Sequence, residues 1–287
     1  MSKAYRIARN ELMLHAPQLC FPGLTPFEID PTTATNPIEV IYDAETPLPT
    51  DGDRLLDTFD FTDANAICRL YKCSDGHLFT MTREEITPCA FYIPTSGVVR
   101  CNFAEGDDRS LARFGLWIVF NLRASAHGVL AIHSSVLMHD GGAVLCLGES
   151  GTGKSTHTRL WREHIPGTEL LNDDSPFLAL CDGEVRVFGS PWSGKTPCYR
   201  NLDLPIRGFL RLSQAPVNEI RKLSTLQAYG ALQPSMPPSF AYDSELFDRV
   251  NKLLSTLLRQ TPVYHLRCLP NREAAELARQ TLYADAR

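Results

Sequence analysis

An eight-residue motif near the middle of the chain constrains its fold more than any other stretch. Residues 148–155 read GESGTGKS and fit the pattern G-x-x-x-x-G-K-[ST] at every fixed position. The run before the motif, GGAVLCLG at 141–148, is apolar and has strand length, and KSTHTRLWREH at 154–164 can form a helix. A strand, a glycine-rich turn and a helix in this order predict a phosphate-binding loop in an α/β sheet.

Each residue type in the motif has a reason in phosphate chemistry. Glycines let backbone N–H groups approach phosphate oxygens, and the helix start adds partial positive charge. Lys154 is expected to face solvent and reach the β- and γ-phosphates, and the Ser155 hydroxyl to ligate Mg²⁺. The alternative is a glycine-rich turn with an incidental lysine. We therefore expect ATP and Mg²⁺ as cofactors, held by these residues: Gly148, Glu149, Ser150, Gly151, Thr152, Gly153, Lys154, Ser155 and Thr156.

Composition narrows the function classes. Hydrophobic residues make up 44% of the 287 residues, which is enough for a sizeable core. A net charge of −5 argues against sequence-independent nucleic-acid binding, which needs a basic surface. The opening residues MSKAYRIARNELMLH have no signal-peptide core, and the most apolar run, FGLWIVFNL at 114–122, is too short for a membrane helix. We expect a cytoplasmic protein with no nucleic-acid or membrane partner.

Cysteine and histidine spacing gives no sign of a structural metal site. The nine cysteines include no CxxC pair, and the eight histidines include no HxxxH pair. An odd number of cysteines at irregular spacing is typical of reduced thiols rather than of a disulfide framework. We expect no structural zinc.

Two regions of the chain differ in pattern. Residues 1–105 contain short runs of strand composition at 37–45, 77–82, 90–94 and 97–103. Helical and strand patterns then alternate, with helices expected at 107–128, 154–164, 244–258 and 272–282 and strands at 141–148, 168–180, 183–189, 205–212 and 263–268. This pattern predicts a β-rich lobe over residues 1–105 and an α/β domain over 106–287.

A double aspartate follows the phosphate-binding motif. In LLNDDSP, Asp173 and Asp174 end an apolar run about twenty residues after Lys154. Adjacent aspartates usually form solvated turns. Phosphoryl transfer, however, needs a carboxylate to hold Mg²⁺ or to accept the proton of the attacking hydroxyl. We expect the strand before the loop and the strand before the aspartates to be neighbours, so that both strand ends border one cleft.

The stretch IHSSVLMHDGGAVLCLGESGTGKST, followed by LLNDDSP, resembles a known catalytic core. It is similar to HPr kinase/phosphorylase and its relatives with the phosphoenolpyruvate-carboxykinase type of P-loop, over residues 130–180. The resemblance implies a P-loop α/β core with a mixed sheet. It implies that one of Asp173 and Asp174 acts as general base toward the acceptor hydroxyl, that the other ligates Mg²⁺ with Ser155, and that His133 lies beside them. Which aspartate has which role stays open, with Asp173 favoured as the base and Asp174 as the metal ligand. Without the resemblance, His133 would more often be a buried core histidine.

The segment GSPWSGKTPCYRN at 189–201 is the second unusual stretch. Its cations, Lys195 and Arg200, are candidate catalytic residues that would face the triphosphate or the acceptor. The alternative is a hairpin turn with surface charge. Small kinase-like proteins of the resembling group carry a similar PWSGK segment, which favours the site role.

These features together predict a phosphotransferase. We expect an ATP- and Mg²⁺-dependent kinase acting on a hydroxyl, and the resemblance favours a serine of a peptide or small protein as acceptor. A small-molecule hydroxyl stays open, as do a GTP or pyrophosphate donor and a homo-oligomer. The alternative function is a nucleotide-dependent switch or binding protein with slow ATP or GTP hydrolysis.

Overall fold

A computed structural model describes residues 2–43, 48–49, 52–83, 88–104, 106, 108–149, 151–194 and 196–284. The chain forms two compact units. The first comprises Met1–His127 and Ser239–Phe247, and the second comprises Gly128–Pro238 and Asp248–Arg287. Both units contain a sheet that mixes parallel and antiparallel strands, so the fold is mixed α/β.

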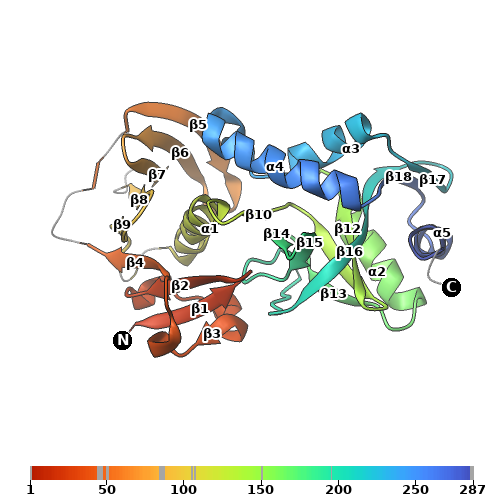
Figure 1. Cartoon of the computed structure of the whole chain (residues 1–287), viewed down its shortest axis with the longest axis horizontal. Coiled ribbons are helices and arrows are strands. Elements are labelled where there is room, and N and C mark those ends of the chain that lie inside the picture. Colours follow the sequence, from red (N-terminus) through yellow and green to blue (C-terminus); the bar gives the residue numbers. More distant parts are fainter. Residues whose placement is uncertain are drawn as a thin grey trace. The chain divides into compact units, whose positions relative to one another are not determined.

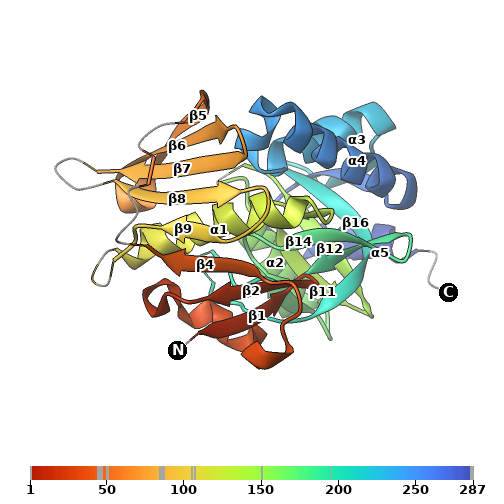
Figure 2. The ribbon, with the colours of Figure 1, turned by 60° about the vertical axis from the view of Figure 1, so that its left-hand side comes forward.

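The first unit is built on one long sheet (Figure 2). Within the described residues its strand order is β3-β1-β2-β4-β9-β8-β7-β6-β5. Neighbouring strands run antiparallel, except that β4 is parallel to both β2 and β9. The bounds are β1 Lys3–Ile7, β2 Asn10–Leu14, β3 Glu28–Ile29, β4 Ile38–Tyr42, β5 Arg54–Phe61, β6 Ala66–Cys73, β7 Gly76–Thr82, β8 Cys89–Pro94 and β9 Val99–Cys101.

One helix, α1 at Arg109–Ser125, packs on this sheet. The Asp108 carboxylate accepts from the Ser110 backbone N–H and caps its start. Leu116 and Phe120 are fully buried, and the absence of a side chain at Gly115 lets α1 approach Phe91 of β8 closely. No helix among the described residues is both long and apolar enough to cross a membrane.

The second unit contains the other mixed sheet, in the order β10-β14-β15-β16-β12-β11-β13, with β18 joining β16 and β17 joining β18. Strand β16 is parallel to both β12 and β18, whereas β11 is antiparallel to β12 and β13. The bounds are β10 Val129–Ala131, β11 Ser135–His139, β12 Gly142–Leu147, β13 Glu169–Asn172, β14 Phe177–Cys181, β15 Glu184–Phe188, β16 Asp203–Gln214, β17 Glu219–Lys222 and β18 Val263–Cys268.

Helices α2 (Lys154–His164) and α5 (Arg272–Leu282) lie side by side against this second sheet (Figure 1). Trp161 of α2 and Ala275 and Ala278 of α5 are fully buried in one cluster with Val144 and Leu210 of the sheet. Helices α3 (Thr225–Leu232) and α4 (Ser244–Gln260) complete the described helices. The cluster holds α2, and with it the loop before α2, against the sheet.

The strand neighbours predicted from the sequence are wrong in one respect. Strand β12, which ends at the glycine-rich loop, and β13, which ends at the double aspartate, do not pair with each other. Strand β11, which the pattern analysis did not identify, lies between them and is antiparallel to both. Because β12 and β13 are thereby parallel to each other, their carboxyl ends still lie at the same edge of the sheet.

The same substitution at two helical glycines should have opposite effects on stability. A Cβ at Gly115 would lie 2.1 Å from a ring carbon of buried Phe91, whereas a Cβ at Gly230 of α3 would meet nothing within 4 Å. We expect Gly115→Ala to lower the free energy of unfolding by about 1–3 kcal/mol through overpacking. Gly230→Ala should raise it by roughly 0.5–1 kcal/mol. Urea unfolding followed by circular dichroism measures both, and equal signs would contradict the packing of α1.

Candidate active site

The candidate site lies at the sheet edge where β12 and β13 end and β11 begins. The loop follows β12, and Asp173 and Asp174 follow β13. His133 stands two residues before β11, which enters the sheet at the same edge because it is antiparallel to both strands. The Ser134 backbone N–H donates to the Asp174 carbonyl at 3.0 Å and fixes this arrangement. The topology therefore brings His133, the loop and the aspartates together.

The loop has a backbone that suits glycine. Gly153 adopts φ 104° at the start of α2, and Gly148 adopts φ 154°, where a Cβ would lie 2.3 Å from the Thr152 hydroxyl. Thr152 donates through its hydroxyl to the Glu149 carbonyl at 2.9 Å, which closes the turn. Ser155 and Thr156 lie in the first turn of α2. Ser150 falls outside the described residues.

Lys154 is buried, so the expectation that it faces solvent is wrong. The residue is 9% exposed, and its amine donates to the carbonyls of Gly148 at 2.5 Å and Glu149 at 3.3 Å. Burial lowers the pKa of the Lys154 ammonium, while the nearby Asp174 carboxylate raises it. The Lys154 amine therefore forms hydrogen bonds with two backbone carbonyls of the loop to which it belongs, and these bonds tie the start of the loop to the start of α2.

His133 connects Lys154 to Asp174. Its Nε2 lies 3.1 Å from the Lys154 amine, and its Nδ1 lies 3.4 Å from Asp174 Oδ1. A charged lysine only donates, so Nε2 acts as acceptor and the ring proton is assigned to Nδ1, on the side of the carboxylate. The His133 side chain is 49% exposed, which excludes a buried core histidine. The three side chains form one continuous polar row.

Asp173 points to different partners. Its Oδ1 accepts from the Ser193 hydroxyl at 2.6 Å and from the Gly194 N–H at 2.7 Å, and its Oδ2 accepts from the Thr196 N–H at 2.8 Å. The two adjacent carboxylates therefore serve different surroundings, Asp173 the 193–196 turn and Asp174 the side of the loop lysine. Lys195, between Gly194 and Thr196 in the sequence, falls outside the described residues.

A buried amide that the sequence analysis did not single out organises the aspartate turn. Asn172 is fully buried at the end of β13. Its Oδ1 accepts from the backbone N–H groups of Asp174 at 3.0 Å and Ser175 at 2.9 Å, and its Nδ2 donates to the Trp192 carbonyl at 3.0 Å. One side chain thus joins the double aspartate to the 190–194 segment. The only sequence signal for this role of Asn172 was its position directly before the two aspartates.

Strand β16 brings two further polar side chains to the loop. Arg211 Nη2 lies 3.6 Å from Glu149 Oε1, and its charge acts on Lys154, lowering the pKa of that ammonium. Gln214 Nε2 donates to the Gly151 carbonyl at 3.1 Å. Both residues sit at the carboxyl end of β16, the parallel neighbour of β12. Sequence pattern identified this strand but not which strand it would pair with, so these residues were missed.

Arg200 does not join the His133, Lys154 and Asp174 row. Its guanidinium pairs with Glu169 at 2.6 Å, at the start of β13 and therefore at the opposite end of that strand from Asp173. The sequence analysis expected Arg200 to face the triphosphate or the acceptor. The structure places it in a cavity beside α2 and β13.

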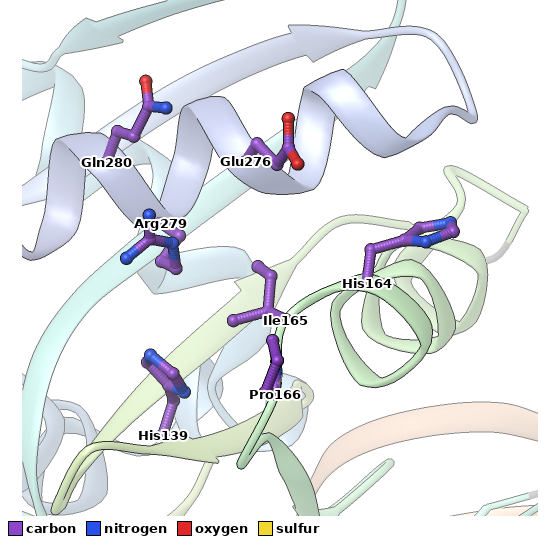
Figure 3. Close-up of a pocket in the computed structure, with 7 residues that line it drawn as sticks. All are labelled: His139, His164, Ile165, Pro166, Glu276, Arg279 and Gln280. Atoms are coloured by element: carbon purple, nitrogen blue, oxygen red, sulfur yellow. The ribbon is translucent and has the colours of Figure 1, made fainter.

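Another cavity in the second unit, of about 340 Å³, lies between the end of α2 and α5 (Figure 3). His164, Ile165 and Pro166 come from the end of α2 and the turn after it, and the α5 residues lie across from them. The lining contains none of the predicted site residues. The lining residues are His139, His164, Ile165, Pro166, Glu276, Arg279 and Gln280.

Comparison with known proteins gives a remote structural likeness. No protein-family model and no curated protein matches the chain. Among solved structures, the chain is similar to the HPr(Ser) kinase/phosphatase from Coxiella burnetii, with 13% identity and a TM-score of 0.31. The match covers 54% of this chain and 95% of the other. A likeness at this level indicates at most a remote relationship of fold.

Removing the Asn172 side chain should destabilise the second unit. Asn172→Ala leaves the N–H groups of Asp174 and Ser175 without their buried acceptor, which we expect to cost about 2–4 kcal/mol of unfolding free energy. The control is Asn251→Ala, which removes one half-buried hydrogen bond from the Tyr229 hydroxyl and should cost no more than about 1 kcal/mol. Chemical denaturation compares them, and equal losses would contradict the organising role of Asn172.

Removing the Lys154 amine should weaken nucleotide binding without unfolding the protein. A hydrogen bond to a charged group contributes about 1.5–3 kcal/mol, so we expect Lys154→Ala to reduce ATP affinity by at least roughly tenfold. Lys222→Ala, an exposed position on β17, serves as the control and should bind like the parent. Calorimetry measures affinity and circular dichroism measures folding. Unchanged ATP affinity in Lys154→Ala would refute the loop as a phosphate site.

Proposed function

We propose that this chain is an ATP- and Mg²⁺-dependent phosphotransferase that acts on a hydroxyl, in the manner of the HPr kinases it resembles. The observation that carries the proposal is the continuous row formed by Lys154, His133 and Asp174 at the mouth of the glycine-rich loop. A cation beside the loop and a carboxylate beside the cation are the groups that phosphoryl transfer requires. The net charge of −5 does not favour nucleic acid and is compatible with a small-molecule or peptide acceptor.

The residues of the loop suit a triphosphate. Glycines with positive φ turn the backbone immediately before α2, whose start carries partial positive charge. When nucleotide binds, the Lys154 ammonium would exchange the Gly148 and Glu149 carbonyls for phosphate oxygens. Arg211, now beside Glu149, would add a second cation at the same edge. The Glu149 side chain is 86% exposed, so water solvates its carboxylate when Arg211 turns to the phosphates.

The donor set for a metal also fits Mg²⁺. The Ser155 hydroxyl and the Asp174 carboxylate are hard oxygen ligands, and Mg²⁺ is usually held by one or two carboxylates together with substrate phosphates. Among the described residues, no group of three or more His, Cys, Asp or Glu side chains forms a metal cage. Bound there, the metal would neutralise charge on the transferred phosphoryl group.

Asp173 suits the part of general base toward the acceptor. Its Oδ1 already accepts from a serine hydroxyl, that of Ser193, at 2.6 Å. This contact is a model of how an acceptor serine would approach the carboxylate, which also keeps lone-pair capacity after its three hydrogen bonds. The acceptor oxygen would attack the γ-phosphorus and its proton would pass to Asp173. The bond between the γ-phosphorus and the bridging oxygen would break, and ADP would leave with that oxygen and the electron pair of the bond.

The experiment that tests the proposal is a search for the acceptor. The full chain is incubated with γ-³²P-labelled ATP and Mg²⁺, with serine-containing peptides, free hydroxy amino acids and cell extract offered separately. We expect label on a hydroxyl of one of these acceptors. Free labelled phosphate with no labelled acceptor would overturn the kinase proposal in favour of the switch with slow hydrolysis, the second candidate function.

The two aspartates should lose different functions when their charge is removed. Asp173→Asn should leave Mg·ATP affinity within a few-fold and lower transfer by roughly 10²–10⁴, the range for a lost general base. Asp174→Asn should weaken the binding of Mg·ATP more than that of metal-free ATP, because the Asp174 carboxylate would be a Mg²⁺ ligand together with Ser155. Asp248→Asn, an exposed position on α4, is the control.

Calorimetry with and without Mg²⁺ and single-turnover transfer separate the two roles. Thermal unfolding of Asp173→Asn checks the 193–196 turn, because an amide cannot accept from all three of its donors. Identical changes in affinity and rate for both variants would show that the pair acts as one shared metal clamp instead.

A further inference from the structure

A cavity of about 670 Å³ lies in the second unit beside α2 and β13. We call it the basic pocket, and its charged lining consists of Arg159, Arg162, Glu163, Glu169 and Arg200. Arg159 and, one turn later, Arg162 and Glu163 come from α2, while Glu169 begins β13 and Arg200 lies four residues after Thr196. Thr196, which carries a hydrogen bond to Asp173, also lines it.

Among the described residues, the lining of the basic pocket has one more cation than it has carboxylates. Arg159 pairs with Glu163 through two contacts of 2.8 and 2.9 Å, and Arg200 pairs with Glu169 at 2.6 Å. Arg162 has no carboxylate within ion-pair distance in the part of the chain that the structure describes. Its charge acts on the Cys198 thiol, which also lines the pocket. An anion entering the pocket therefore meets a guanidinium with no competing carboxylate.

The paired arginines can also contribute. Glu163 and Glu169 are 45% and 59% exposed, and ion pairs between exposed groups are worth no more than about 1 kcal/mol. Such a pair exchanges one carboxylate for another at little cost. Guanidinium groups bind carboxylates through two parallel hydrogen bonds, so a cavity lined by three arginines suits a carboxylate.

The basic pocket is connected to the candidate active site through three elements. Helix α2 runs from Lys154 to Arg162, eight residues or about 12 Å. Strand β13 runs from Glu169 toward Asp173, four residues or about 13 Å. Thr196 touches both places, because its backbone N–H donates to Asp173 and the residue lines the pocket. An extended peptide covers this span with three or four residues.

We infer that the basic pocket binds a carboxylate of the acceptor peptide, three or four residues from the hydroxyl that receives the phosphoryl group; this rests on the proposed phosphotransfer. The chemistry recognised is a carboxylate on an extended chain. It can come from an Asp or Glu side chain or from the carboxyl terminus of the peptide. Arg162 is then a specificity-determining residue, and Arg159 and Arg200 assist it by releasing their glutamates.

The test uses alanine-based peptides with one serine and one glutamate moved through positions −5 to +5. Transfer of ³²P from ATP by the full chain is measured as kcat/KM for each peptide. The acidic preference is the kcat/KM of the glutamate peptide divided by the kcat/KM of the same peptide with glutamine at that position. We expect a preference of roughly tenfold at one position three or four residues from the serine, weakening as salt is raised. A second series places a free or an amidated carboxyl terminus at that position to identify the source.

Two variants change the pocket's charge in opposite directions. Arg162→Gln should reduce the acidic preference to about one, whereas Glu169→Gln, which releases Arg200, should increase it several-fold. Arg272→Gln is the matched control, because Arg272 forms a similar exposed pair with Glu276 at 2.7 Å outside the basic pocket. Its preference should equal that of the parent. An acidic preference that Arg162→Gln leaves intact would overturn the assignment.

Direct binding separates failure of the pocket from failure of the proposed function. Fluorescence anisotropy of two rhodamine-labelled, C-terminally amidated peptides, Ala-Glu-Ala-Ala-Ser-Ala and Ala-Ser-Ala-Ala-Glu-Ala, is measured without nucleotide. Binding that Arg162→Gln weakens and Glu169→Gln strengthens supports the basic pocket even where no peptide is phosphorylated, and in that case only the phosphotransfer fails. Efficient transfer without any acidic preference or binding overturns the pocket and leaves phosphotransfer standing.

Discussion

The antiparallel strand β11 between β12 and β13 determines which residues meet at the candidate active site. A strand that runs against both neighbours makes those neighbours parallel, so the loop after β12 and the aspartates after β13 emerge at one edge. The residues before β11 enter at that edge as well, which puts His133 between the Lys154 amine and Asp174. Without β11, the loop, the double aspartate and His133 would not meet at one edge of the sheet.

Buried polar contacts then hold that edge in shape. The carboxamide of Asn172 supplies an acceptor to the aspartate turn and a donor to the 190–194 segment, and Ser190 donates to the Ser175 carbonyl at 2.6 Å from the opposite side. Buried groups of this kind are costly when unpaired, so the network favours one arrangement of the two carboxylates. The two aspartates can have different roles only if their surroundings differ. That difference is set by the buried network around them rather than by the aspartates themselves.

Sequence pattern predicted helices well where an apolar periodicity and the residues that begin a helix lie close together in the sequence. The limits of α2 and α5 agree with those expected, because Gly153 and Asn271 mark their starts and an apolar stripe continues through each. Strand β11 was missed since SVLMH is short and stands beside a longer apolar run. Burial of Lys154 could not be predicted either, because the motif specifies a phosphate ligand while the loop's own carbonyls, visible only in three dimensions, take the amine. Arg211 required knowledge of strand pairing, which pattern does not contain.

Charge is distributed unevenly along α2 and β13, the helix and strand that connect the candidate active site with the basic pocket. At its start α2 presents Lys154 beside the Asp174 carboxylate, and two turns later it presents Arg159 and Arg162 to a cavity of their own. Strand β13 reverses the order, with Glu169 at its beginning and the double aspartate at its end. A phosphate donor at one end and an anionic group at the other would each meet cations of α2, while the carboxylates of β13 lie across from them. An acceptor that is neutral at its hydroxyl and acidic about 12 Å away would complement this pattern along its whole length, since its hydroxyl can approach the Asp173 carboxylate without charge repulsion and its own carboxylate reaches Arg162.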